Sequence, residues 1–191
     1  MARSFWVAVA ALGMALAVQP AASQTTPKPD AAKPAPGPVS ADPQSTTAAY
    51  GDWVVRCQRI GDGAAAQRVC EAAETIQTQG AQGPIAQIAI GRVAPTDPLR
   101  LTLVLPPNVS FPSAPRMEVD DKDAHPVDLN WRRCLSGGCF ADAEMKDDLL
   151  QFWRRQAGQG SIKFRDGVGR DIAAPFSFRG LAQALDALAK S

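Results

Sequence analysis

The sequence predicts a mostly-β protein: a single antiparallel β-sandwich or barrel-like domain with two short helices, stapled by two disulfides. Strict alternation of leucine with other residues over 99–105 is typical of a half-buried strand. Four cysteines fall into two short-range pairs behind an apolar leader, which favours disulfides over a thiol site. Many short strand patterns beside two helical ones indicate an antiparallel architecture.

The chain begins with the pattern of a secretory signal peptide over residues 1–23. Arg3 precedes an apolar stretch at 5–18, and small residues before Gln24 predict cleavage after Ser23. The apolar stretch is shorter than the roughly 20 residues that a membrane-spanning helix needs. We therefore expect an exported protein, periplasmic or secreted, that is not inserted in the membrane after the leader is cleaved.

Residues 24–49 differ sharply in composition from the rest of the chain. They hold six prolines among alanine, threonine, serine and lysine, with hardly any large apolar residue. Such a segment cannot bury enough surface to offset the loss of chain entropy on folding. We expect a disordered Pro/Ala-rich linker here and one folded domain over 50–191. That domain has as many acidic as basic residues, so its charge does not favour nucleic acid as a partner.

The strand patterns follow in order along this domain. Apolar residues over 53–57 and 68–70 flank a Gly-Asp-Gly turn, which predicts a hairpin. The stretch from Ile85 to Val93 predicts the next strand, with a shift in register between Ile85 and Ile88. Further short strands are expected at 99–105, 117–120, 127–134, 139–145, 161–165 and 171–178.

Two segments have helical spacing instead. Residues 147–157 repeat large apolar side chains, with Asp147 or Asp148 as N-cap and Gly158 at the end. We expect Trp153 in this helix to be a core residue. A second, C-terminal amphipathic helix is expected where apolar residues recur at helical positions, namely Leu181, Ala184, Leu185 and Leu188.

The four cysteines allow three pairings, and the sequence alone does not choose among them. Pairing of Cys57 with Cys70 fits best, because these residues lie on the two arms of the predicted hairpin. Cys134 and Cys139 would then close a tight loop. A zinc site or a redox dithiol is the alternative. Zinc usually needs two closely spaced Cys or His pairs, whereas here only Cys134 and Cys139 are that close and His125 is the only histidine. A redox dithiol usually has Cys-x-x-Cys spacing, which neither pair has. We expect no metal and no cofactor.

A series of motifs along the domain is shared with a known family. Gly51-Asp52-Trp53 precedes Cys57, and Trp131-Arg132-Arg133-Cys134 leads into the second cysteine pair. Phe176-Ser177-Phe178-Arg179-Gly180 precedes the last helix. Their order and spacing over 50–191 resemble the invasion-associated locus B family of exported alphaproteobacterial proteins. The resemblance implies an exported domain, and it brings no established catalytic residues.

A small periplasmic hydrolase is the alternative on the enzyme side. His125 lies beside an acidic stretch that includes Asp120, Asp121 and Asp123. Either the histidine or a pair of carboxylates could act in hydrolysis. No Gly-x-Ser-x-Gly elbow accompanies them, and a solvated acidic turn accounts for the same residues. We therefore expect no catalysis.

Protein binding is the function that the residues favour. Trp131, Arg132 and Arg133 place an aromatic ring and two guanidinium groups beside the second cysteine pair, and Trp and Arg are enriched at binding hot spots. Trp131 also fits a core position, so its role stays open between core and interface. We expect an unidentified protein partner in the envelope or outside the cell. A purely structural envelope role is the other alternative.

Overall fold

The computed structural model describes residues 43–191 except 79, 81, 95, 121 and 124, and leaves the side chain of Ala64 undescribed. The predicted signal peptide and the predicted linker up to Asp42 lie outside the described residues. Asp121 of the acidic stretch lies outside them as well.

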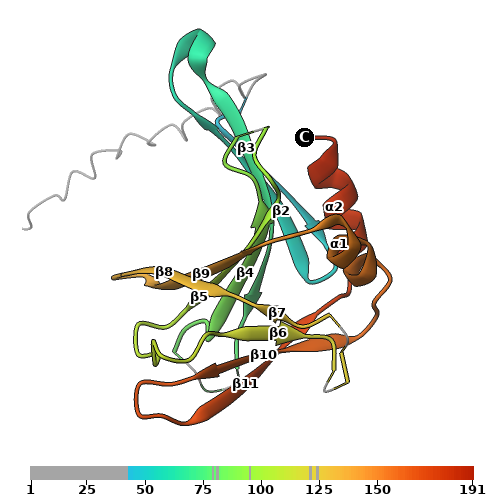
Figure 1. Ribbon diagram of the computed structural model, residues 1–191. Helices are drawn as coiled ribbons and strands as arrows, with labels where there is room; N and C mark the ends of the chain where they lie inside the picture. The colour runs from blue at the N-terminus through green and yellow to red at the C-terminus, as the bar shows by residue number, and fades with distance from the viewer. Residues whose placement is uncertain (1–42, 79, 81, 95, 121, 124) are drawn as a thin grey trace, which may run out of the picture. The chain divides into compact units, whose positions relative to one another are not determined.

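The larger of two antiparallel sheets has, among the described residues, seven strands in the order β1-β2-β3-β4-β5-β9-β8 (Figure 1). The first five are a meander in chain order, and the β8–β9 hairpin extends the sheet beyond β5. A 3-10 helix over Gly63–Ala65 lies in the turn between β2 and β3. The strands are β1 (Ser45–Tyr50), β2 (Trp53–Ile60), β3 (Gln67–Ile76), β4 (Ala86–Gly91), β5 (Arg100–Leu105), β8 (Asn130–Leu135) and β9 (Gly138–Glu144).

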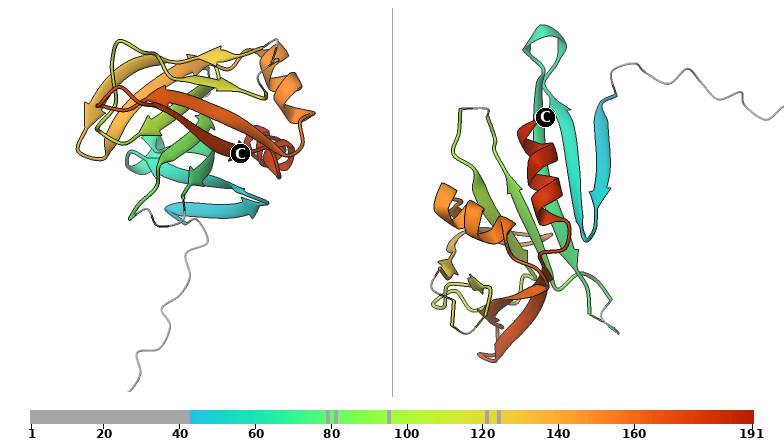
Figure 2. Two further views of the ribbon diagram at one scale, coloured as in Figure 1. Left: turned by 90° about the horizontal axis from the view of Figure 1, so that it is seen from below. Right: turned by 90° about the vertical axis from the view of Figure 1, so that its right-hand side faces the viewer.

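A smaller antiparallel sheet has the order β11-β10-β6-β7. Two helices, α1 and α2, complete the described part, and α2 packs against β2 and β3 (Figure 2). The bounds are β6 (Arg116–Glu118), β7 (Val127–Asp128), β10 (Gln159–Arg165), β11 (Asp171–Ser177), α1 (Asp147–Arg154) and α2 (Leu181–Ala189). The predicted mostly-β fold with two antiparallel sheets, two helices and two disulfides is confirmed.

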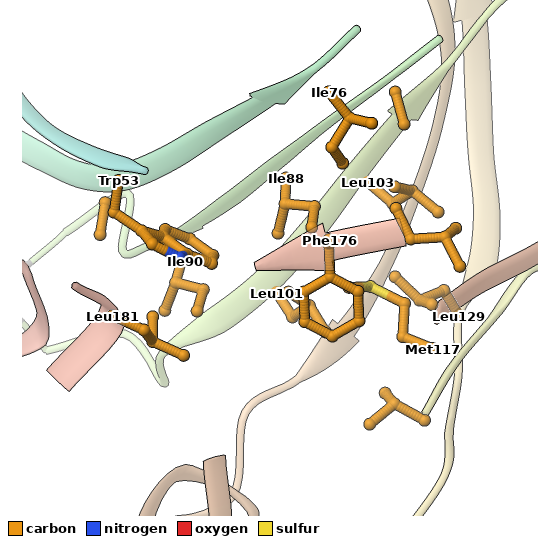
Figure 3. Close-up of a cluster of buried hydrophobic side chains, with 14 of the residues drawn as sticks. Trp53, Ile76, Ile88, Ile90, Leu101, Leu103, Met117, Leu129, Phe176 and Leu181 are labelled. Atoms are coloured by element: carbon orange, nitrogen blue, oxygen red, sulfur yellow. The ribbon is translucent and has the colours of Figure 1, made fainter. Parts of the chain in front are cut away.

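One face of the large sheet forms most of the core. Alternate residues of its strands point to this face, as expected for a period of two residues. In Figure 3, Phe176 of β11 points into the cluster that the isoleucines of β4 and the leucines of β5 form. Trp53 and Trp153 are both completely buried, as the sequence predicts for Trp153. The inward-facing residues of β4 and β5 are Ala86, Ile88, Ile90, Leu101, Leu103 and Leu105.

Both disulfides are local. Cys57 on β2 bonds Cys70 directly opposite on β3, and Cys134 on β8 bonds Cys139 on β9. Each bond therefore joins two neighbouring antiparallel strands. This is the pairing that the hairpin interpretation favours.

The folded part begins earlier in the sequence than the predicted end of the linker. Strand β1 begins at Ser45, whereas the linker was expected to continue to Ala49. β1 pairs with β2 from Ser45 opposite Gln58 to Tyr50 opposite Trp53. Most of its side chains are exposed, so no apolar alternation marks it in the sequence. Backbone hydrogen bonds to β2, rather than burial of side chains, define this strand.

Two strand predictions are also wrong in detail. β4 has no shift in register, because Ala86 takes the inward position ahead of Ile88 and Ile90. Val93 lies beyond the strand and is 75% exposed. The single strand expected at 127–134 is two strands, β7 in the small sheet and β8 in the large one. The chain passes between the sheets at Leu129, which is completely buried.

The two helices begin differently. α1 has Lys146 as N-cap without a side-chain cap, so the predicted aspartate cap is wrong. Asp147 and Asp148 lie in its first turn instead, where a negative charge stabilises the helix dipole. α1 ends at Arg154, and α2 follows Gly180, whose φ is 89°. Neither helix has the length and apolar composition needed to cross a membrane, and the same holds throughout the described residues.

Candidate functional site

Strand β8 lies at one edge of the large sheet. Within the described chain it pairs on one side with β9, from Asn130 opposite Asp142 to Leu135 opposite Gly138. The pairing is irregular between Trp131 and Arg133, which indicates a β-bulge. The Cys134–Cys139 disulfide fixes the end of this hairpin covalently. The edge is therefore held in an extended form with exposed side chains.

Trp131 is half-buried and lies on the core side of β8. It is opposite Ala141, which is completely buried. Its indole N–H donates to the backbone oxygen of Ser113 at 3.1 Å. The ring centroid of Phe111 lies 5.2 Å from that of Trp131, and Phe111 is 51% exposed. The ring of Trp131 thus contacts the core, and its neighbour Phe111 faces solvent.

Arg132 and Arg133 lie on the other face of the sheet. Arg132 donates through Nε to Asp142 at 2.7 Å, and Arg100 of β5 bonds the same carboxylate. Partial burial raises the pKa of Asp142, but the hydrogen bonds from Arg100 and Arg132 outweigh it and hold the pKa below its usual range. The guanidinium carbon of Arg133 lies 5.8 Å from the centroid of the Phe140 ring, within the range of a cation–π contact.

The three residues predicted for binding are therefore neighbours on β8 but do not share one surface. Trp131 joins Phe111 on the core side, and the two arginines face the open side. Leu135 at the end of the strand is 54% exposed. Sequence reasoning missed Phe111 and Leu135, because Phe111 comes from a distant proline-flanked segment and Leu135 lies just outside the motif. Among the described strands β8 is an edge strand, with aromatic side chains on one face and two arginines on the other, and such an edge is suited to an extended peptide.

His125 and its acidic neighbours form a solvated turn. Asp123 accepts the backbone N–H groups of Val119 and His125, both at 2.7 Å, and Asp120 accepts that of Lys122 at 2.7 Å. The His125 ring stacks on Phe152 of α1 with centroids 4.7 Å apart, and His125 is exposed. The carboxylates are thus used to stabilise the turn, as Asx-type bonds do.

Two cavities lie among the described residues at which His125 is not a lining residue. One, of about 270 Å³, lies between α1, α2 and the start of β3. The other, of about 480 Å³, is lined by residues of β10 and β11 and by Ser113 and Arg116. Among the residues that the structure describes, no group of three or more His, Cys, Asp or Glu side chains has an arrangement that could hold a metal ion.

A polar network joins the β1–β2 turn and the start of β2 to the end of β11. Ser177 at the end of β11 donates its hydroxyl to Asp52 at 2.7 Å, and its backbone oxygen accepts the indole N–H of Trp53 at 2.8 Å. Arg179 also bonds the Asp52 carboxylate. The hydrogen bonds from Arg179 and Ser177 lower the pKa of Asp52 to about 2.

Glu74 of β3 completes this network from the core side. It is 8% exposed and accepts the backbone N–H of Ser177 at 3.0 and 3.1 Å. Burial raises the pKa of Glu74 to about 7, and the charge of Asp52 adds to the effect. Two of the motifs that carry the family resemblance, at 51–53 and 176–180, therefore meet at one buried junction that fastens the two sheets together.

Comparisons with known proteins agree with this fold. A family model described as "Invasion associated locus B (IalB) protein" matches residues 53–189. A crystal structure of invasion associated protein b from Bartonella henselae superimposes with a TM-score of 0.63. The two chains are 16% identical, and the match covers 76% of this chain and 95% of that one. This likeness shows a shared fold. No curated protein sequence matches the chain.

Proposed function

This chain belongs to the invasion associated locus B family, and we propose that it is an exported, non-catalytic protein that binds another protein. The proposed site is the edge strand β8 with Phe111. The partner is a protein of the envelope or the extracellular space. The observation that carries the proposal is the exposed edge of β8, stapled to β9 and bearing aromatic, apolar and cationic side chains.

Backbone geometry supports this use of β8. An edge strand presents N–H and C=O groups that an extended segment of a partner can pair with. The Cys134–Cys139 bond keeps β8 aligned with β9, so little ordering of the chain is needed when the partner binds. Leu135 and Phe111 supply exposed apolar area, at 54% and 51% exposure.

Charge supports an acidic partner segment. Arg132 and Arg133 are both exposed, and they lie close together on one face of β8. Asp142 is shared between Arg132 and Arg100, so one carboxylate serves two guanidinium groups. A partner segment with acidic residues at alternate positions would meet this excess of positive charge.

Export is supported by the leader pattern and by the oxidised cysteines. All four cysteines are paired in two disulfides, and such bonds persist in oxidising compartments. We propose cleavage after Ser23, followed by a proline-rich linker that leads to β1. We propose no catalytic role for His125, Asp120 or Asp123, since the turn itself uses the two carboxylates and His125 lies outside both cavities.

Chemical crosslinking and capture of the tagged protein from envelope fractions test the proposal. The double variant Arg132→Ala/Arg133→Ala should lose the crosslinked species that the wild-type protein forms. A matched control, Arg116→Ala/Arg165→Ala, removes two exposed strand arginines of the small sheet that are also ion-paired and should keep those species.

His125→Ala should also keep the crosslinked species. Equal capture by the β8 variant and the wild type, at equal thermal stability, would contradict the proposed site. If only His125→Ala loses the crosslinked partner, the binding site lies at the acidic turn rather than on β8.

A further inference from the structure

The cavity between α1, α2 and β3 has the chemistry of a ligand site. Its apolar wall includes Leu99, Leu150, Leu185 and Leu188, which come from both helices and from the segment before β5. Three of these leucines, at 99, 150 and 188, are partly exposed although they pack against the core. Val93 also lines the cavity and is 75% exposed. Apolar area is thus accessible to a ligand from inside the cavity.

Cations gather at the same cavity. Arg68 of β3, Arg92 just after β4 and Arg154 of α1 line it, and none of the described lining residues has an acidic side chain. Arg154 pairs with Asp186 at 2.6 Å, but Asp186 is not among the lining residues. Arg68 donates to the neutral hydroxyl of Thr46 at 2.8 Å. All charged side chains among the described lining residues are therefore positive, and they lie beside apolar walls.

Arg154 bonds Asp186 through Nη1. Its Nε is buried and has no hydrogen-bond partner within the described part of the chain. A buried N–H of a guanidinium group that lacks an acceptor is unfavourable, and an anionic oxygen is the acceptor that stabilises it most. Arg154 lines the cavity, and its Nε, which is not itself exposed there, has no acceptor among the described residues.

We propose that this cavity binds a single-chain amphiphilic anion of the fatty-acid class. The acyl chain lies along the leucines of α1 and α2, and the carboxylate is bound by the arginines. The volume of about 270 Å³ fits one medium-length chain rather than a two-chain lipid. The Cys57–Cys70 bond supports the wall, because Cys70 lines the cavity and the disulfide fixes β3 to β2. This site is separate from β8 and does not depend on the function proposed above.

Binding of decanoate, below its micellar concentration, tests the proposal in the folded protein. Calorimetry or amide chemical shifts should show saturable binding, with shifts at residues of α1, α2 and the start of β3. Decanol, which lacks the charge, should bind at least about tenfold more weakly, because contacts to a charged group contribute that much. Decyltrimethylammonium, with the opposite charge, should not bind.

Variants identify the residues involved. Arg68→Gln/Arg92→Gln should weaken decanoate binding by about tenfold or more, and Val93→Asn should weaken it without affecting the fold, since Val93 is exposed. Arg165→Gln is the matched control, an exposed arginine that lines the other cavity, and should bind like the wild type.

Three results would overturn the proposal: no saturable binding of decanoate, equal binding of decanol and decanoate, or unchanged affinity in the Arg68/Arg92 variant. The protein should carry any tag away from Ser191, because Ser191 lines the cavity.

Discussion

Both carboxylate oxygens of Glu74 accept the backbone N–H of Ser177, at 3.0 and 3.1 Å, across the boundary between the two sheets. Glu74 occupies an inward position on β3, between Ala72 and Ile76, where the pattern of the strand places apolar residues. A buried carboxyl group is tolerated there because it is hydrogen-bonded and because burial favours its neutral form. We therefore expect this junction to make the free energy of unfolding depend on pH.

The free energy of unfolding should fall as the pH rises from about 4.5 to about 7, the unfolded and folded pKa values of Glu74. Over this range the folded protein keeps a proton that the unfolded chain has released, so the contribution is present at lower pH and lost above the folded pKa. At about 1.4 kcal/mol per pKa unit, the loss is at most about 3 kcal/mol.

Urea unfolding at several pH values measures this slope. Glu74→Gln should flatten it, whereas Glu71→Gln, on the same strand but on the opposite face, should keep it. A Glu74→Gln protein with the full wild-type slope would show that another group is responsible.

Gly180→Ala should destabilise the protein by about 3 kcal/mol or more, because a Cβ there would lie 1.9 Å from the backbone oxygen of Tyr50. Gly169→Ala is the matched control. Its φ of 85° is close to the 89° of Gly180, but a Cβ would meet nothing within 4 Å. It should cost only the conformational strain, about 1 kcal/mol. Similar melting temperatures for the two variants would contradict the close approach of 50–51 to 179–180.

Leu181→Ala should cost about 2–5 kcal/mol, because Leu181 is completely buried at the start of α2. Gln183→Ala, at an exposed position of the same helix, should leave the free energy of unfolding almost unchanged. Chemical denaturation of both proteins gives the comparison. If Leu181→Ala unfolds like the wild type, the apolar face of α2 is not part of the core.

Peptide mapping without reductant should recover the Cys57–Cys70 and Cys134–Cys139 peptides and no free thiol. Replacing the first pair with alanine should cost about 3 kcal/mol and replacing the second about 2, because the first bond closes the longer loop. The sequence separations are 13 and 5 residues. A larger cost for the second pair would mean that the β8–β9 hairpin contributes more to the fold than loop entropy indicates.

The sequence predicts the parts of this fold in which buried apolar residues recur with the period of a strand or a helix. The leucines of β5 and the apolar face of α2 are found where the pattern places them, and the disulfides have the local pairing that the predicted hairpin favours. β1 was not predicted, because backbone pairing with β2 holds it and its side chains bury little surface. The interruption between β7 and β8 at Leu129 was not predicted either, since an apolar residue inside a strand pattern does not show that the chain passes from one sheet to the other.

The candidate site could be predicted only in part. The motif at 131–133 lies on an exposed edge, but a β-bulge and strand pairing decide that Trp131 and the two arginines face opposite sides. Phe111 reaches Trp131 from a segment far away in the sequence. The environment of Glu74 depends on Ser177, about a hundred residues later. Such relationships are set by tertiary packing, which local patterns do not encode.

The central claim, that β8 is a protein-binding edge, is tested most directly by site-specific photo-crosslinking in cells. A photo-reactive phenylalanine analogue at Leu135, 54% exposed at the end of β8, should give a discrete crosslinked species. The same analogue at Val168, 78% exposed between β10 and β11, should not. Adding Arg132→Ala/Arg133→Ala should abolish the species formed at Leu135. No crosslink at Leu135, or the same species from Leu135 and Val168, would contradict the account.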